Sequence, residues 1–328
     1  MAILYPTLSR RRETDQVLGA KILFESNSAP LLRLAMSAYA GLPGHRLSAS
    51  SLRLKVQLLL RPTGHLRRRG RAEPPLLEMF SGSGWLGAGS QASDFVLLSP
   101  QLQRAMVVVS EQTLGYPYHA RYELVEFAVF TLAARCQRLA SLHAACVGLH
   151  GRGVLLMGPS GSGKSTVTML CLLQGFDFLS EDSVFVAPRT MRATGVANFL
   201  HVRADSLKWI AKPVARRIRQ SPVIQRRSGI RKYEVDLRTG GHRLAARPQK
   251  IAAVVFLSAK RAGKQPLLLP LSRAATLARL AEAQAYVVNQ PEWPALAGGV
   301  ARLRGFELRR GVHPYDSVDA LRTLLSSG

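Results

Sequence analysis

Hydrophobic and polar residues alternate in several short segments of the first third of the chain, which is the pattern of half-buried strands. The segments 52–60, 94–98 and 106–110 follow it and predict three strands. Residues 64–89 are rich in Arg, Pro, Gly and Ser, and they predict a loop region with one short insertion of structure at 76–80. From 122 to 142 apolar residues recur at helical spacing without Pro or Gly, which predicts a helix of about five turns.

The hydrophobic pattern changes at residue 143, where short strands and helices begin to alternate. Apolar stretches at 143–147 and 154–157 flank the turn-rich GLHGRG and predict a hairpin. A helix is predicted over 164–174, and Gly175 suits a left-handed cap at its end. The other predicted elements are strands at 176–180, 184–187 and 251–257 and a terminal helix near 317–325. This order is typical of an α/β nucleotide-binding core with a mixed sheet.

Length and composition set the organisation of the chain. At roughly 100–200 residues per domain, 328 residues indicate two domains. We expect a smaller α+β N-terminal domain over 1–121, a linking helix over 122–142 and a P-loop domain over 143–328. Apolar residues make up 47% of the chain, which excludes disorder driven by polarity for most of it.

Cysteine usage and apolar runs bear on the cellular compartment. The three cysteines have no CxxC spacing, which excludes a disulfide framework and a cysteine zinc site. The start of the chain has no apolar stretch of signal-peptide length, and the longest apolar runs, such as 251–257, fall far short of the roughly 20 residues of a membrane helix. The sequence therefore predicts a cytoplasmic protein that is neither secreted nor membrane-spanning.

The net charge is large and positive, since 45 Lys and Arg stand against 20 Asp and Glu, giving +25. Such a charge suits nucleic acid, an anionic membrane surface or an acidic peptide. Arginine exceeds lysine and is scattered in short clusters, a bias that a genome rich in G and C produces without selection for anion binding. Charge alone therefore does not choose a partner.

Residues 158–165 read GPSGSGKS, which fits the phosphate-binding pattern G-x-x-x-x-G-K-[ST]. The motif follows an apolar strand and opens a helix, the context that the pattern requires. Its glycines let backbone N–H groups turn toward phosphate oxygens, Lys164 reaches the β- and γ-phosphates, and the Ser165 hydroxyl is a Mg²⁺ ligand. The residues predicted to hold the nucleotide are Gly158, Pro159, Ser160, Gly161, Ser162, Gly163, Lys164, Ser165 and Thr166. We expect ATP or GTP to bind there with Mg²⁺.

An acidic pair, Glu181 and Asp182, distinguishes this motif from other nucleotide-binding classes. The chain has no Asn-Lys-x-Asp base reader of a GTPase and no LSGGQ stretch of an ABC-type ATPase. An eleven-residue helix carries the chain about 16 Å away from the phosphates, and five extended residues return it by about 16 Å. The pair therefore falls beside the loop, where a carboxylate can ligate Mg²⁺ or take the proton of an attacking hydroxyl.

His143 is placed by the hairpin register. If Val147 pairs with Val154, His143 falls opposite Gly158, at the mouth of the loop. There the imidazole can contact the γ-phosphate or tune Asp182, or it is a capped strand-end histidine without a role. A slip of one residue would turn it to the other face.

These motifs resemble the HPr kinase/phosphorylase family, bacterial serine kinases whose P-loop core is related to phosphoenolpyruvate carboxykinase. The similarity rests on His143, on GPSGSGKS at 158–165 and on the acidic pair, at the family's spacing. It implies Asp182 as the catalytic base and Glu181, where the family has Asp, as its partner at the metal. The family's catalytic arginine precedes a late strand, and RPQKIAAVVF puts Lys250 or Arg247 near that position.

The resemblance stops at a glycine-rich signature associated with phosphorylase activity. The corresponding residues 194–208 read TGVANFLHVRADSLK, so the sequence gives no support for that activity. The N-terminal part does not match the bifunctional enzymes, so HPr is not the first choice of acceptor. The chain is similar instead to HPr-kinase-related proteins, which include kinases that phosphorylate serine on ribosomally made peptides such as lasso precursors.

The sequence thus predicts an ATP- and Mg²⁺-dependent kinase acting on a serine hydroxyl of a peptide or protein, an acidic one if the arginines serve its capture. The expected catalytic residues are Asp182, Glu181, His143, Lys164 and Lys250, with Ser165, Asp182 and Glu181 at the metal. Self-association is compatible with the sequence. Two alternatives stay open. One is a small-molecule kinase on the same core. The other is a nucleotide-gated nucleic-acid-binding ATPase, which the charge favours but no nucleic-acid-binding motif supports.

Overall fold

The computed structural model describes residues 11–47, 52–62, 76–90 and 94–327. The chain divides into two compact units. Unit 1 comprises Met1–Ala40 and Ser48–Gln137, and unit 2 comprises Gly41–Leu47 and Arg138–Gly328. Among the helices of the described residues, none is both long and apolar enough to cross a membrane.

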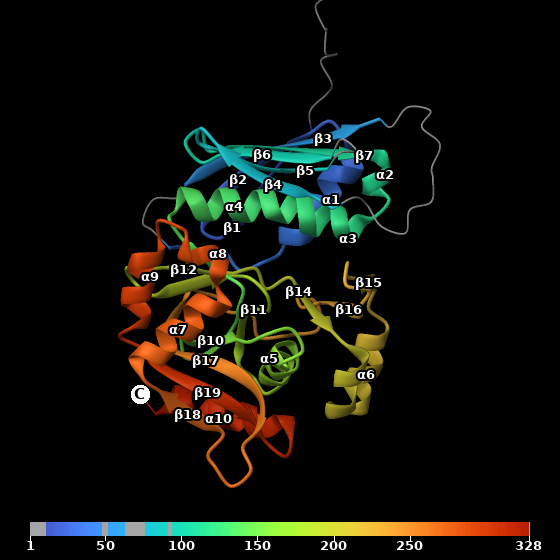
Figure 1. The fold of residues 1–328 in the computed structure, drawn as a ribbon. Coiled ribbons are helices and arrows are strands. Elements are labelled where there is room, and N and C mark those ends of the chain that lie inside the picture. Colours follow the sequence, from blue (N-terminus) through green and yellow to red (C-terminus); the bar gives the residue numbers. More distant parts are fainter. Residues whose placement is uncertain (1–10, 48–51, 63–75, 91–93, 328) are drawn as a thin grey trace, which may run out of the picture. The chain divides into compact units, whose positions relative to one another are not determined.

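Unit 1 is built on a seven-stranded sheet with the order β1-β2-β3-β7-β6-β5-β4. Its strands are β1 (Arg11–Val17), β2 (Ala20–Ser26), β3 (Arg53–Arg61), β4 (Glu78–Gly82), β5 (Trp85–Gly89), β6 (Phe95–Ser99) and β7 (Arg104–Ser110). The pairs β2–β3 and β3–β7 are parallel and the others are antiparallel. The helices α1 (Ala29–Tyr39) and α4 (Phe127–Cys136) run along one face (Figure 1). Between β7 and α4 the chain forms the shorter helices α2 (Glu111–Leu114), α3 (Pro117–His119) and the π-helix η1 (Ala120–Glu126).

Two sequence predictions for this part of the chain are corrected. The helix expected over 122–142 ends at Cys136, because Arg138 adopts a left-handed φ of 52° and residues 140–142 form β8 (Ala140–Leu142), paired with another strand. The helical spacing of apolar residues does not reveal this switch, since Leu139 and Leu142 fit that spacing and are nevertheless buried in and next to a strand. The expected loop at 64–89 contains the hairpin β4–β5, whose turn at Ser83 and Gly84 has positive φ, while residues 63–75 lie outside the described residues.

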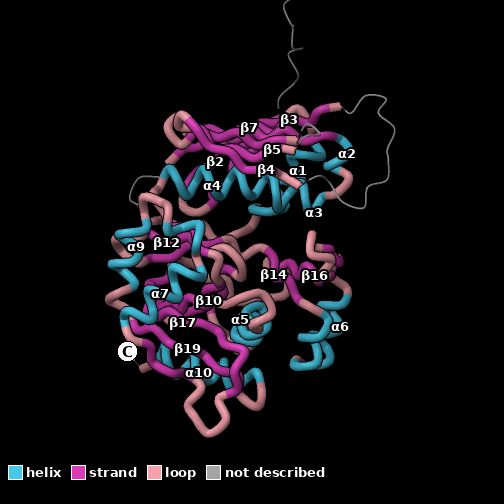
Figure 2. Tube along the Cα trace, viewed as in Figure 1, coloured by secondary structure: helices cyan, strands magenta, loops and turns pink. Residues whose placement is uncertain are grey.

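Unit 2 contains a nine-stranded mixed sheet with the order β11-β9-β10-β17-β13-β12-β8, and β19 pairs with both β17 and β18. Beyond β8, its strands are β9 (Ala145–Leu149), β10 (Arg152–Met157), β11 (Asp177–Ser180), β12 (Val184–Ala187), β13 (Arg192–Gly195), β17 (Gln249–Arg261), β18 (Leu268–Leu271) and β19 (Arg304–Arg310). A three-stranded sheet holds β14 (Phe199–Val202), β16 (Arg231–Asp236) and β15 (Val223–Gln225). Figure 2 shows β10, β17 and β19 side by side, and they are paired in parallel.

Helices pack on both faces of the large sheet. The helices of unit 2 are α5 (Lys164–Leu173), the 3₁₀ helix η2 (Ala204–Trp209), α6 (Lys212–Arg219), α7 (Arg273–Ala283), α8 (Ala285–Val288), α9 (Trp293–Val300) and α10 (Pro314–Ser326). Along β10, Val154 and Leu156 belong to the core shared with α5 and α10, whereas Leu155 and Met157 belong to the core shared with α7 and α9. Burial on both faces is why this strand is continuously apolar rather than alternating.

The sequence predictions for unit 2 agree closely with this structure. The hairpin β9–β10 has the expected register, with Val147 opposite Val154. The helix α5 ends next to Gly175, whose φ of 80° is left-handed as predicted. The mixed α/β class is likewise observed, with the sheet order that brings β11 and β10 to either side of β9.

Candidate active site

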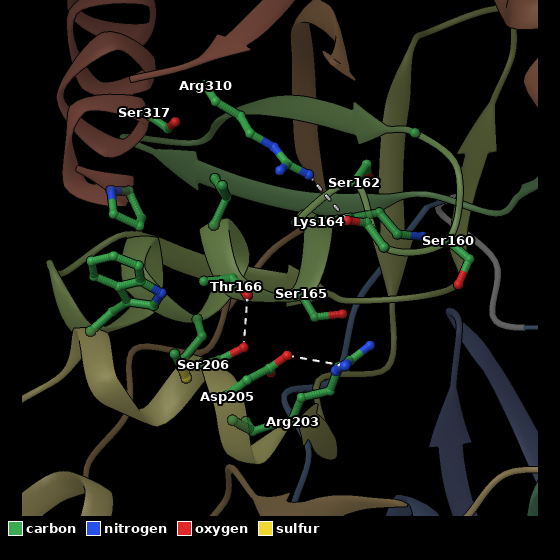
Figure 3. Close-up of a pocket in the computed structure, with 18 of the residues that line it drawn as sticks. Ser160, Ser162, Lys164, Ser165, Thr166, Arg203, Asp205, Ser206, Arg310 and Ser317 are labelled. Atoms are coloured by element: carbon green, nitrogen blue, oxygen red, sulfur yellow. Dashed lines mark hydrogen bonds and ion pairs between the residues drawn. The ribbon is translucent and has the colours of Figure 1, made fainter. Parts of the chain in front are cut away.

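The glycine-rich loop, residues 158–163, connects the end of β10 to the first residue of α5, Lys164. Gly163 caps the helix with a φ of 102°, a conformation that L side chains rarely adopt. A Cβ on Gly158 would approach the Ser162 Oγ atom to 2.7 Å. The loop borders a cavity of about 520 Å³ in unit 2. In Figure 3, Ser160 and Lys164 lie on one side of this cavity and Ser317 on the other.

The acidic pair follows directly after β11 and reaches the loop, as the chain-length arithmetic predicted. Glu181 is buried, and its Oε1 atom accepts a hydrogen bond from the Ser165 hydroxyl. Asp182 Oδ1 lies 3.5 Å from Lys164 Nζ and 3.3 Å from His143 Nδ1. Both carboxylates line the cavity, and the Asp182 side chain, 19% exposed, is the more accessible of the two.

His143 stands at the mouth of the loop, and its backbone is held by a buried glutamine that sequence reasoning missed. The His143 N–H donates to Gln284 Oε1 at 2.8 Å, and Gln284 Nε2 donates to the His143 carbonyl at 3.0 Å. Lys164 Nζ lies 3.2 Å from His143 Nε2. Because an ammonium only donates, Nε2 is the acceptor, and the ring proton is on Nδ1, which faces Asp182.

A buried charge cluster that carries no sequence motif supports the acidic pair. His201 on β14 donates its backbone N–H to Glu181 Oε2 at 3.2 Å, and its Nε2 atom lies 3.2 Å from Glu234 Oε1 on β16. His201 and Glu234 are cross-strand partners 33 residues apart in sequence. Sequence reasoning missed both, because only the long-range pairing of β14 with β16 brings them together.

The charges in this cluster stabilise one another. Burial opposes the charged form of His201, yet its bonds to Glu181 and Glu234 raise the pKa of the imidazole above its usual value. Burial likewise opposes the charge of Glu181, but His201 lowers the pKa of that carboxyl. The imidazole of His201 therefore lies between two buried carboxylates that favour its charged form.

The His201→Gln variant is expected to be destabilised by about 1–3 kcal/mol near pH 6, because the charged hydrogen bonds to two buried carboxylates are lost. Since the pKa of His201 is raised on folding, its contribution is fully present below its unfolded value of 6.5 and lost as pH rises through the folded value. The difference in free energy of unfolding, measured by urea titration, should therefore shrink toward pH 9. His150→Asn, at an exposed turn residue, is the control. A difference independent of pH would contradict a charged His201.

Cations surround the acidic pair and the loop. Arg226 approaches Asp182 Oδ2 at 3.4 Å, and Arg310 NH2 approaches the Gly161 carbonyl oxygen at 3.4 Å. Burial lowers the pKa of Lys232, which faces both Glu181 and Asp182. The cationic residues that line the cavity are Lys164, Arg203, Lys208, Arg226, Lys232, Arg261 and Arg310, against the acidic residues Glu181, Asp182 and Asp205. The excess of positive charge suits an anionic ligand.

Lys250, expected near the catalytic centre, is not brought there. It pairs with Arg152 at the start of the parallel strand β10, whereas the loop follows the other end of that strand, about 16 Å away at 3.3 Å per residue. Its Nζ atom donates to the Thr190 carbonyl at 2.7 Å. The strand β17 instead brings its other end, Arg261, to the cavity. The prediction was wrong because β17 is parallel to β10, so the residues at the start of β17 lie at the edge of the sheet away from the loop.

The described residues contain no group of three or more His, Cys, Asp or Glu side chains arranged to hold a metal ion by themselves. All three cysteines are free, and burial raises the pKa of Cys136 to about 11 and those of Cys146 and Cys171 further. The thiolate form of each cysteine is therefore disfavoured, and a cysteine nucleophile is not expected.

Comparison with known proteins found matches among solved structures. No protein-family model and no curated protein matches the chain. Among solved structures, the chain is similar to the HPr(Ser) kinase/phosphatase from Coxiella burnetii, with 12% sequence identity and a TM-score of 0.29. The match covers 57% of this chain and 88% of that one. The functional proposals therefore rest on the geometry of the cavity and not on this similarity.

Proposed function

We propose that the protein transfers the γ-phosphoryl group of ATP to a serine hydroxyl of a peptide or protein. The observation that carries the proposal is the position of Asp182, which faces the cavity beside Lys164, while its neighbour Glu181 accepts a hydrogen bond from Ser165. A phosphate-binding loop needs the lysine and the serine for any nucleotide. A carboxylate that is both exposed to the cavity and within reach of the phosphates is what transfer to an alcohol adds.

The donor atoms near the loop fit Mg²⁺. The ion prefers oxygen ligands and is usually bound by one or two carboxylates together with substrate phosphates. Ser165 and Glu181 offer a hydroxyl and a carboxylate already in contact, and in the loop before them the buried Ser162 Oγ atom has no hydrogen-bond partner among the described residues. We assign Ser165 and Glu181 as the residues that would hold the ion, with Asp182 next to them. When bound, Mg²⁺ would neutralise charge on the transferred phosphoryl group.

The other steps, which are phosphate binding, proton transfer and stabilisation of charge, are assigned to different residues of the chain. The N–H groups of the loop and the start of α5 hold the phosphates, and Lys164 adds a cation to the β- and γ-phosphates. Asp182 accepts the proton of the attacking hydroxyl, and His143 orients that carboxylate through its Nδ1 proton. Arg226, Arg261 and Arg310 supply further positive charge where negative charge builds up on the phosphoryl oxygens.

The cationic rim supports an acidic acceptor. Arg226 and Lys232 line the cavity on the side of Asp182, the side from which the acceptor hydroxyl must approach. An acidic peptide would meet this charge before its serine reaches the carboxylate. A neutral small alcohol would gain no binding energy from this positive charge. We therefore rank a small-molecule kinase second.

The acceptor class is tested with labelled ATP and Mg²⁺. The acceptors are serine peptides flanked by Asp and Glu, the same peptides with Ser replaced by Ala, and a panel of small alcohols. We expect label only on the serine peptides, with a KM for peptide that rises with salt while kcat stays nearly constant, because surface charges are screened beyond about 8 Å at physiological ionic strength.

Each other result of this experiment selects an alternative. Label only on small alcohols would favour the small-molecule kinase. ATP hydrolysis that needs DNA or RNA, together with binding that weakens steeply with salt, would favour a nucleic-acid-binding ATPase. No binding of ATP at all would contradict the function of the loop itself.

A further inference from the structure

We infer that the end of the cavity away from the glycine-rich loop binds the base of the nucleotide, which stacks on an aromatic platform, the Trp209 indole, with the His313 ring standing perpendicular beside it. The inference rests on the proposed function, because it assigns the part of the cavity that a triphosphate on the loop does not fill. The ligand of this part of the cavity is a planar nucleobase. The affinity of the protein for ATP therefore depends in part on the contact between the base and the aromatic rings.

The cavity extends well beyond the loop. It follows α5, where Thr166, Val167 and Met169 line it, and α5 rises 1.5 Å per residue. Met169 is thus about 7.5 Å along the axis from Lys164. From there the lining passes to η2 and to the start of α10, so the whole cavity of about 520 Å³ has the size of a site for a ligand larger than a phosphate chain.

Aromatic rings gather at this far end. The Trp209 and His313 ring centroids are 5.0 Å apart at 88°, and His313 stacks on Tyr315 at 5.3 Å and 5°. Trp209 and Tyr315 pack against the hydrophobic core, which fixes the platform before any ligand binds. The ammonium of the exposed Lys208 lies 4.8 Å over the indole, so this face of Trp209 is open to solvent and not covered by the core. A base can take the place of the ammonium on that face.

Polar groups flank the platform on the side of the loop. The Thr166 and Ser206 hydroxyls lie 2.9 Å apart, and Figure 3 shows this contact next to Asp205. Asp205 lines the same stretch of the cavity. Hydroxyl and carboxylate oxygens are suitable partners for ribose hydroxyls, which in a nucleotide lie between the phosphates and the base. The lining thus runs from the glycine-rich loop, through the hydroxyls and the Arg203–Asp205 ion pair, to the aromatic rings. This is the order of the phosphates, ribose and base in a nucleoside triphosphate.

The acceptor does not compete for this end of the cavity. Asp182, which receives the hydroxyl proton, is contacted by Lys164, His143 and Arg226. These residues come from α5, from the start of β9 and from the segment before β16, not from η2 or α10. An aromatic platform away from Asp182 therefore fits the nucleotide better than a side chain of the acceptor.

The test compares ATP with inorganic tripolyphosphate, which carries the phosphates without a base. In a Trp85→Phe, Trp293→Phe background, Trp209 is the sole tryptophan of the chain and reports on binding by its fluorescence. We expect ATP with Mg²⁺ to change this emission and to bind roughly tenfold more tightly than tripolyphosphate, within the range that stacking of a base on an aromatic side chain supplies.

Calorimetry on the otherwise wild-type chain then tests the two rings. Trp209→Leu keeps an apolar side chain against the core but removes the ring, and it should weaken ATP binding roughly tenfold while leaving tripolyphosphate unchanged. Trp209→Phe should restore most of the affinity. His313 is the N-cap of α10, so His313→Asn keeps a capping side chain while removing the ring, and it should weaken ATP binding roughly threefold. Tyr286→Ala, at an exposed aromatic residue of α8, is the control.

The outcomes separate this inference from the proposed function. If ATP and tripolyphosphate bind equally tightly and Trp209→Leu changes neither, the base does not use the platform, and the phosphate site stands. If neither ligand binds to the wild-type chain, the proposed function fails and the inference with it. If Trp209→Leu weakens both ligands equally, Trp209 has a structural role only, and the inference is overturned.

Discussion

Asp182→Asn is expected to lower the rate of phosphoryl transfer by a factor of about 10²–10⁴, the usual contribution of a positioned acid or base. The amide keeps the size of the side chain but cannot accept the hydroxyl proton. It also removes the negative charge that lies 3.5 Å from Lys164 Nζ and 3.4 Å from Arg226 NH2. ATP affinity should be unchanged or slightly higher, because less negative charge then faces the phosphates. Single-turnover transfer to a serine peptide and calorimetric titration with ATP measure the two quantities.

The matched control for this variant is Asp177→Asn, at the start of β11, the strand that precedes Asp182. Asp177 pairs with Arg243 at 2.9 Å and is not among the residues that line the cavity. It should keep wild-type transfer. Equal turnover in Asp182→Asn and the wild type would mean that Asp182 is an ordinary partner of surface cations and that the proposed role is wrong.

Lys164→Met is expected to reduce turnover to below a hundredth of the wild-type value and to weaken ATP binding. The Lys164 side chain is 9% exposed and its ammonium faces both Asp182 and His143. Methionine fills a similar space without the charge, so the β- and γ-phosphates lose their cation and meet the Asp182 carboxylate uncompensated. Loss of one preorganised electrostatic contact alone costs about 10²–10³ in rate.

Lys250→Met serves as the control for Lys164→Met, because Lys250 is an exposed lysine whose ammonium is bonded to the Thr190 carbonyl far from the loop. It should leave both turnover and ATP affinity unchanged. Retention of more than about a tenth of wild-type turnover in Lys164→Met would contradict the assignment of the loop. A large loss of turnover in Lys250→Met would instead indicate that Lys250 has the catalytic role expected from the sequence.

The sequence alone determined the local features of unit 2. The strand, loop and helix around GPSGSGKS, the left-handed Gly175 and the return of the acidic pair to the loop all depend on residues fewer than 25 positions apart. Local propensity and the fixed rise of helix and strand are enough for such distances. The hairpin register that puts His143 at the mouth of the loop is short-range in the same way.

Tertiary structure decided whatever depends on pairing between distant segments. His201 meets Glu234 only because β14 pairs with β16, and Arg261 rather than Lys250 reaches the cavity only because β17 runs parallel to β10. The break of the predicted helix at Cys136 likewise follows from the pairing of β8 with β12. The aromatic platform joins Trp209 to His313, 104 positions later in the chain. A sequence pattern records which residues prefer burial, but not which distant strand will cover them, because strand pairing is chosen by the packing of the whole sheet.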